Sequence, residues 1–145
     1  MKKVIHDALA GLMPKLRMVQ AAIEGAEEGW TENYDRNDPQ DQYLRNEYGA
    51  IGERIDDIRT AFDLLNAPVV AEGQLAKNGL GRYEVGGFEL NSGSRVEYLQ
   101  RGEHGWPDMW RASRIEHNLD YYIVAEPELP LAGVLVRIKR VKRFG

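Results

Sequence analysis

The sequence contains no cysteine and few histidines, and these absences remove whole classes of chemistry. Without cysteine the chain has no disulfide, no thiolate metal site and no cysteine nucleophile. The histidines, His6, His104 and His117, are too far apart in the sequence for the close pairing that many metal sites use. We therefore expect neither a metal site nor a cofactor.

Long apolar runs are also missing. No run approaches the roughly 18 residues that a membrane helix needs. The N-terminal segment lacks the apolar centre of a signal peptide, because Asp7, Lys15 and Arg17 interrupt it. We expect a cytoplasmic protein without membrane contact. Hydrophobic residues nevertheless make up 43% of the 145 residues and charged residues 29%, which is typical of a folded chain.

The net charge of −4 is unevenly distributed along the chain. Residues 1–66 carry 8 basic and 13 acidic side chains, whereas residues 67–145 carry 11 and 10. Residues 24–41 hold seven acids against Arg36 alone, and residues 137–143 hold five bases and no acid. Such segments are either solvated surface or contacts with an oppositely charged partner or module.

Two helices are predicted in the first half. Apolar residues at spacings of three and four predict an amphipathic helix over about residues 3–27, with a kink at Pro14. A second helix is predicted over 39–65, with Asp38 as its N-cap and a stop at Asn66 to Pro68. Its apolar residues form a seam with steps of four and three: Leu44, Tyr48, Ile51, Ile55, Ile58, Phe62 and Leu65. The helices pair as an antiparallel hairpin, or the same seam completes a four-helix bundle in a homodimer.

From residue 69 onward the apolar period shifts towards two and turn residues multiply. Gly86-Gly87 between two short strands is a two-residue hairpin signal. Strands are predicted at 83–85, 88–90, 95–99, 109–115, 119–124 and 134–141. Many short strands in so few residues favour a small, bent barrel over a flat sheet with open edges. The predicted fold class is α+β, with a helical hairpin over 1–67 followed by an SH3-like antiparallel β-barrel over 68–145.

Six segments of the second half carry a resemblance to a known family. They are GQL (73–75), GRYEV (81–85), FELNSGSRVEYL (88–99), WRASRIEH (110–117), DYYIV (120–124) and LAGVLVRI (131–138). Over about residues 72–139 the chain resembles the bacterial domain-of-unknown-function family 5348, found largely in Gram-positive bacteria and often on mobile elements. The resemblance implies a short, cofactor-free barrel in a bacterial or phage accessory protein. It implies no activity, because the family has no established one, and the helical segment lies outside it.

The densest titratable cluster of the second half is Glu116, His117 and Asp120. Adjacent residues of a strand point to opposite faces, so Glu116 and His117 do not converge unless a turn bends them together. We interpret them as residues of a hairpin turn. No catalytic residue is therefore assigned, and the chain is predicted not to be an enzyme.

Aromatic residues beside acids are the best candidates for a binding surface. They are Trp30, Tyr34, Asp35 and Tyr43 around the predicted helix–helix loop, and Trp106 and Trp110 in a later loop. Aromatic side chains of this kind either contact a partner or close the end of a helical bundle and the mouth of a barrel. As a contact surface they fit another protein, and the neighbouring acids favour a basic one.

A nucleic-acid interface is the alternative hypothesis. The basic C-terminal strand supplies its candidate residues: Arg137, Lys139, Arg140, Lys142 and Arg143. The acidic first half opposes it, because a protein that neutralises several phosphates usually presents an uninterrupted basic face. We therefore predict a non-enzymatic protein–protein interaction module that regulates or inhibits another protein, encoded by a bacterial mobile element or phage.

Overall fold

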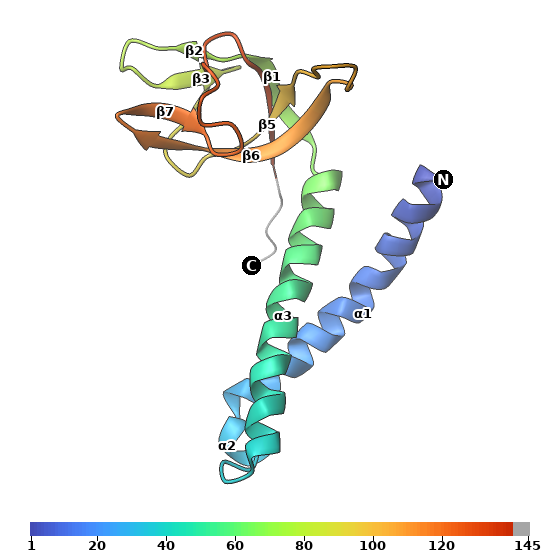
Figure 1. Ribbon diagram of the computed structural model, residues 1–145. Coiled ribbons are helices and arrows are strands. Elements are labelled where there is room, and N and C mark those ends of the chain that lie inside the picture. Colours follow the sequence, from blue (N-terminus) through green and yellow to red (C-terminus); the bar gives the residue numbers. More distant parts are fainter. Residues whose placement is uncertain (141–145) are drawn as a thin grey trace. The chain divides into compact units, whose positions relative to one another are not determined.

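The structure is a computed structural model that describes residues 1–140. The chain divides into two compact units, Met1–Asn66 and Ala67–Gly145, called here the helical unit and the β-unit (Figure 1). Among residues 1–140 no helix is both long and apolar enough to cross a membrane.

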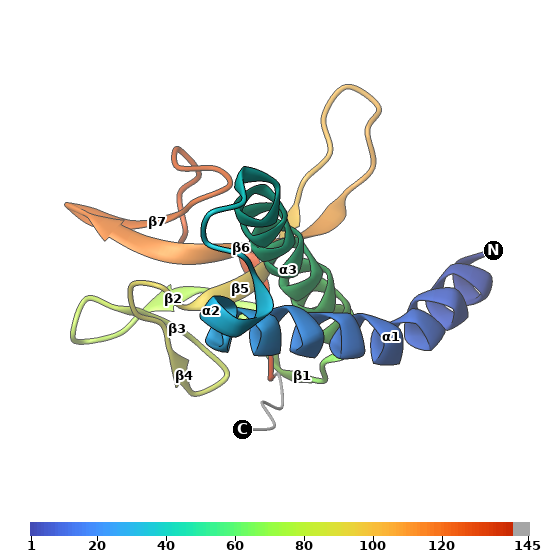
Figure 2. The same cartoon turned by 90° about the horizontal axis from the view of Figure 1, so that it is seen from below.

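The helical unit contains α1 (Lys2–Glu28), α2 (Trp30–Asn33) and α3 (Pro39–Asn66). Helix α1 continues through Pro14 without a break, and Figure 2 shows a bend in its N-terminal half. Helix α3 begins where the sequence predicts, because the Asp38 carboxylate accepts a hydrogen bond of 3.0 Å from the backbone N–H of Gln40.

Helices α1 and α3 run antiparallel, since low residue numbers on α1 meet high numbers on α3. The rings of His6 and Phe62 stand edge to face with centroids 5.3 Å apart. Further along, buried Gln20 accepts a hydrogen bond from Arg59, and at the other end Arg45 contacts Glu27. The interface is thus partly polar, which the apolar pattern of the sequence does not reveal.

The seam predicted on α3 is only partly used in this pairing. Of its seven residues Ile55 is buried, whereas Tyr48, Ile51, Ile58 and Leu65 are exposed. The line of contact with α1 is rotated towards Gly52, which is also buried and whose position lies against the side chain of Ile23. A glycine lets the helices approach closely at a place that an apolar pattern does not mark.

Between residues 67 and 140 the structure describes eight strands of the β-unit in two antiparallel sheets. The strands are β1 (Val69–Gln74), β2 (Ala76–Lys77), β3 (Tyr83–Val85), β4 (Phe88–Glu89), β5 (Arg95–Gln100), β6 (Met109–Asn118), β7 (Asp120–Ile123) and β8 (Leu135–Lys139). One sheet has the order β1-β8-β5-β6-β7 and the other β2-β3-β4. In the part of the chain that the structure describes, β1 and β7 stand at the edges of the larger sheet, so its pairing does not close a barrel.

The core of the β-unit lies between these strands. Tyr98, Ile115, Ile123 and Val136 have no exposed surface. The Tyr98 hydroxyl donates a hydrogen bond of 2.8 Å to the Glu126 carboxylate, so its polar end is satisfied inside the unit. Burial, reinforced by the Glu126 charge, raises the pKa of Tyr98. The apolar side chains of the helical unit are less completely buried than those of this core.

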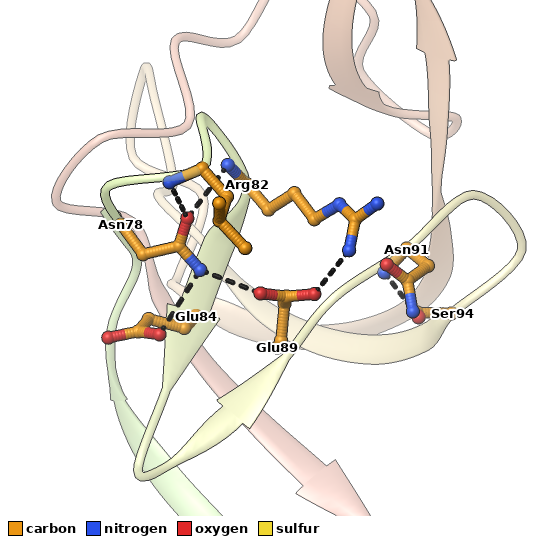
Figure 3. A network of polar contacts seen from close by, with 7 residues as sticks. Asn78, Arg82, Glu84, Glu89, Asn91 and Ser94 are labelled. Carbon is orange, nitrogen blue, oxygen red and sulfur yellow. Dashed lines mark hydrogen bonds and ion pairs between the residues drawn. The ribbon is translucent and has the colours of Figure 1, made fainter.

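Two glycines and a network of side-chain hydrogen bonds stabilise the turns of the small sheet. Gly86 and Gly87 both have positive φ and connect β3 to β4, as the sequence predicts. The Asn78 side-chain oxygen accepts hydrogen bonds from the backbone N–H groups of Leu80 and Arg82, at 2.9 and 3.1 Å. Its amide donates to Glu89 at 2.9 Å, and Arg82 also contacts Glu89, at 2.7 Å (Figure 3). A closed polar network therefore holds the β2–β3 turn to β4.

Candidate functional site

A groove lies between α1 and α3. Its volume is about 1140 Å³, slightly more than the roughly 300–1,000 Å³ of most sites that hold small ligands. Carboxylates from both helices line it: Glu24, Glu27, Glu53, Asp56 and Asp57. We call it the acidic groove.

The groove exists because α3 lacks large side chains along one stretch. Gly49, Ala50 and Gly52 lie on its wall, and a Cβ atom added at Gly49 would meet nothing within 4 Å. Each glycine in a helix interior costs roughly 1 kcal/mol relative to alanine. The helix tolerates this cost twice within one turn, and the result is open space beside a row of acids.

One carboxylate of the groove is already paired. Arg45 donates to both oxygens of Glu27, with a shortest distance of 2.7 Å. This hydrogen bond lowers the pKa of Glu27 and raises that of Arg45. Among the groove-lining residues that the structure describes, Arg45 is the one that carries a positive charge. The groove therefore keeps an excess of negative charge from Glu24, Glu53 and Asp57.

The aromatic candidates of the helical unit lie next to this groove. Tyr34 lines it. Trp30 is half-buried, with the guanidinium of Arg45 3.9 Å and that of Arg36 5.4 Å from its ring centroid. Trp30 thus supports the groove through Arg45 and is a poor candidate for direct contact.

The other two candidates of the helical unit, Asp35 and Tyr43, differ in whether their side chains are already engaged within the unit. The Asp35 carboxylate accepts a hydrogen bond from the backbone N–H of Asn37, and its own N–H donates to Asp41. Asp35 therefore shapes the loop that leads into α3. Tyr43 is 58% exposed, so its ring remains available to a partner.

Trp106 and Trp110 belong to the β-unit. Trp106 is 78% exposed, in a loop that Asp108 closes by accepting hydrogen bonds from Gly102 N–H and Arg101. Trp110 is half-buried, with the guanidinium of Arg137 4.4 Å from its ring centroid. The two tryptophans do not form one exposed surface.

The basic candidates are largely engaged inside the sheet. Arg137 and Lys139 both contact the Glu97 carboxylate, at 2.6 and 3.3 Å, and little of either side chain is exposed. Arg140 is exposed, and its backbone N–H donates to Pro68. Lys142 and Arg143 lie outside the described residues. The cations that the structure places are therefore poorly arranged to follow a phosphate backbone.

Glu116, His117 and Asp120 do not form one metal-binding group of three, although His117 lies near enough to Asp120 for its charge to act on that carboxylate. Glu116 contacts Arg114, whereas the His117 ring packs on Tyr121 with centroids 4.7 Å apart. The Asp120 carboxylate accepts a hydrogen bond from the backbone N–H of Tyr121, and this bond lowers the pKa of Asp120. Within residues 1–140 no three His, Asp or Glu side chains are placed to hold a metal ion together.

Of the groove residues, the sequence indicated Tyr34 as a binding candidate and included Glu24 and Glu27 in the acidic segment 24–41, but it did not indicate the opposite wall. Glu53, Asp56 and Asp57 look like ordinary surface acids of an amphipathic helix. The one available signal was the pair of glycines, Gly49 and Gly52, inside a helix that otherwise has strong helix formers.

Comparison with known proteins concerns the β-unit. Residues 73–138 match the family model whose description is "Domain of unknown function (DUF5348)". The resemblance predicted from the sequence is thereby confirmed for these residues, and the helical unit lies outside the match. No curated protein and no solved structure matches the chain.

Proposed function

We propose that the chain is a non-enzymatic interaction module that holds a lysine- and arginine-rich segment of another protein in the acidic groove. The observation that carries this proposal is the groove itself, where carboxylates of two helices flank a wall of small residues. An open channel of this kind admits a narrow peptide, and its charge selects basic side chains. Tyr34 offers an aromatic face to an arriving guanidinium.

The partner is a basic protein, and binding regulates or inhibits it. The family resemblance of the β-unit supports a bacterial mobile-element or phage accessory protein. The separate placement of Glu116, His117 and Asp120 supports a role without catalysis. Basic proteins often act on nucleic acid, so an acidic groove that occupies their cations would block that contact.

Two finer features of the fold belong to the same proposal. We take α1 and α3 as a two-helix hairpin, because their contacts join distant residues in antiparallel order. We take the β-unit as an open variant of an SH3-like barrel, because its strands enclose one apolar core. In this arrangement the β-unit is the scaffold, and the hairpin carries the binding groove.

The test is the binding of a fluorescent peptide in which lysine and arginine alternate with alanine, followed by anisotropy. The variant Glu53→Gln with Asp57→Asn removes two groove charges and should weaken binding roughly three- to tenfold, since each exposed charge pair contributes about 0.2–1 kcal/mol. Glu47→Gln is the matched control, because this exposed acid of α3 does not line the groove. Equal affinities for the double variant and the wild type would refute the proposal.

Nucleic-acid binding by the basic strand is the alternative outcome of the same experiment. A labelled DNA duplex takes the place of the peptide and is titrated at two salt concentrations. Tight binding with a steep salt dependence, lost on Arg137→Ala with Arg140→Ala, would replace the groove proposal with a nucleic-acid function.

A further inference from the structure

The helical unit leaves two rows of large apolar side chains exposed. The rows run at seven-residue intervals: Ile5, Leu12 and Val19 on α1, and Ile51, Ile58 and Leu65 on α3. Their members are between 42% and 69% exposed. We call them the exposed rows. A seven-residue period on both helices is the spacing at which helices pack against further helices.

The exposed rows lie on the side of the helical unit away from the acidic groove. At 3.6 residues per turn, positions two apart on a helix point roughly 200° apart, so Ile51 is turned away from Gly49 and Glu53. On α1, the buried line through Met13 and Gln20 separates the exposed row from Glu24. A partner on the exposed rows therefore leaves the groove open.

We infer that a second copy of this chain covers the exposed rows, so that four helices, two from each copy, enclose a common core. Helices of 27 and 28 residues are about 40 Å long, and two side by side are about 20 Å wide. The face they offer is thus about 800 Å², which is the area that each partner of a stable complex usually buries. The same period on both helices makes the face complementary to itself.

The charges of α1 specify how the copies are oriented. Its first part carries Lys2, Lys3, Lys15 and Arg17 against Asp7, and its last part carries Glu24, Glu27 and Glu28. Glu24 and Glu27 face the groove, so these charges act on the orientation at long range and not as ion pairs within the dimer contact. When the two α1 helices run antiparallel, the basic end of each lies at the acidic end of the other, whereas a parallel arrangement would place ends of like charge together. The dimer is therefore antiparallel and carries a groove on each outer side.

The first experiment measures the mass of the whole chain in solution by sedimentation. The wild type should have twice the chain mass of 16.5 kDa. Leu12→Lys with Ile58→Lys places four charges in the dimer core and should give the monomer. Met18→Lys is the matched control, because Met18 is an exposed apolar residue of α1 outside the rows, and this variant should stay dimeric. A wild type that is monomeric at its highest soluble concentration would overturn the inference.

A second experiment does not depend on whether the lysine variant folds. The chain has no cysteine, so single cysteines can be introduced cleanly. Ile5→Cys lies at the start of the α1 row and Ala26→Cys lies seven residues beyond its last member, Val19, so an antiparallel dimer brings the two cysteines together between copies. An oxidised mixture of the two variants should give the mixed disulfide in excess over either self-linked product. Self-linked products of each variant alone at equal yield would indicate a parallel pairing and overturn the inference.

The outcome is independent of the proposed groove function. Peptide binding per chain should be unchanged by Leu12→Lys with Ile58→Lys, whose positions do not line the groove, and dimer mass should be unchanged by Glu53→Gln with Asp57→Asn. Failure of one assay with success of the other therefore identifies which of the two surfaces has been wrongly interpreted.

Discussion

The two units of this chain bury their side chains in different ways. The β-unit seals its core, in which Tyr98, Ile115 and Val136 are fully buried. The helical unit buries little beyond Met13 and Ile55, and one of its interior positions is the polar residue Gln20. The core of the β-unit is thus fully enclosed, whereas the helical unit leaves large apolar side chains and the acidic groove exposed. Our proposals therefore place binding on the helices.

The largest expected effect concerns the two cores. Ile115→Ala should lower the free energy of unfolding by about 3–4 kcal/mol, because the cavity it leaves is closed on all sides. Ile55→Ala should cost about 1–2 kcal/mol, because the looser helical interface can relax. Denaturation followed by hydrogen exchange reports each unit separately. Equal losses in the free energy of unfolding for the two variants would contradict the distinction between a sealed β-unit and an open helical unit.

A smaller effect tests whether the polar groups of the β-unit are satisfied internally. Glu97→Ala removes the common partner of Arg137 and Lys139, whose side chains are only 23% and 10% exposed. Leaving these two cations without the carboxylate should cost about 2 kcal/mol in urea denaturation. Gln at this position keeps one hydrogen bond and should cost less. An unchanged midpoint for both variants would indicate that the cations turn out to solvent.

The polar network of the β2–β3 turn predicts a dependence on pH. The hydrogen bond from Arg82, followed by that from Asn78, lowers the pKa of Glu89 from its usual value of 4.5. Its contribution to stability is therefore present above pH 4.5 and is lost as the pH falls through the lower pKa of the folded state.

The unfolding midpoints of the wild type and Glu89→Gln test this dependence. They should differ at neutral pH and converge in acid. Glu128→Gln, at an exposed acid of the same unit, is the control and should match the wild type throughout. A gap that widens in acid would contradict the assigned network.

The smallest expected effect is at the β6–β7 turn. Leu119 has a φ of 68° and is 99% exposed, so it has backbone strain and little packing to lose. Leu119→Gly should raise stability by about 0.5 kcal/mol, measured by thermal unfolding. Leu80→Gly is the matched control, at an exposed leucine without positive φ, and should be neutral or destabilising. A loss of stability at position 119 would mean that the turn is not strained.

Local signals in the sequence predict much of the fold. Asp38-Pro39 marks the start of α3, and Gly86-Gly87 marks the β3–β4 turn, because caps and tight turns depend on neighbouring residues. Contacts between distant residues are not visible in this way. Arg137 reads as a free cation until the fold places Glu97, 40 positions earlier, beside it.

The acidic groove illustrates the same limit. The sequence marks Tyr34 as a candidate and places Glu24 in an acidic segment, but their relation to Glu53 depends on the register between α1 and α3. That register is determined partly by buried Gln20 and by Gly52, which an apolar pattern does not include. The two helices are therefore predictable from the sequence, whereas the choice of their packing partner and the shape of the space between them are not.

The most direct test of the central claim is a nuclear magnetic resonance titration of the isotopically labelled chain with the lysine- and arginine-rich peptide. The amide signals of Gly49 and Gly52 are well suited to this, because both residues lie on the groove wall. The account predicts that these signals and those of Tyr34 shift progressively, while those of the β-unit stay in place. Shifts confined to the β-unit, or none at saturating peptide, would contradict it.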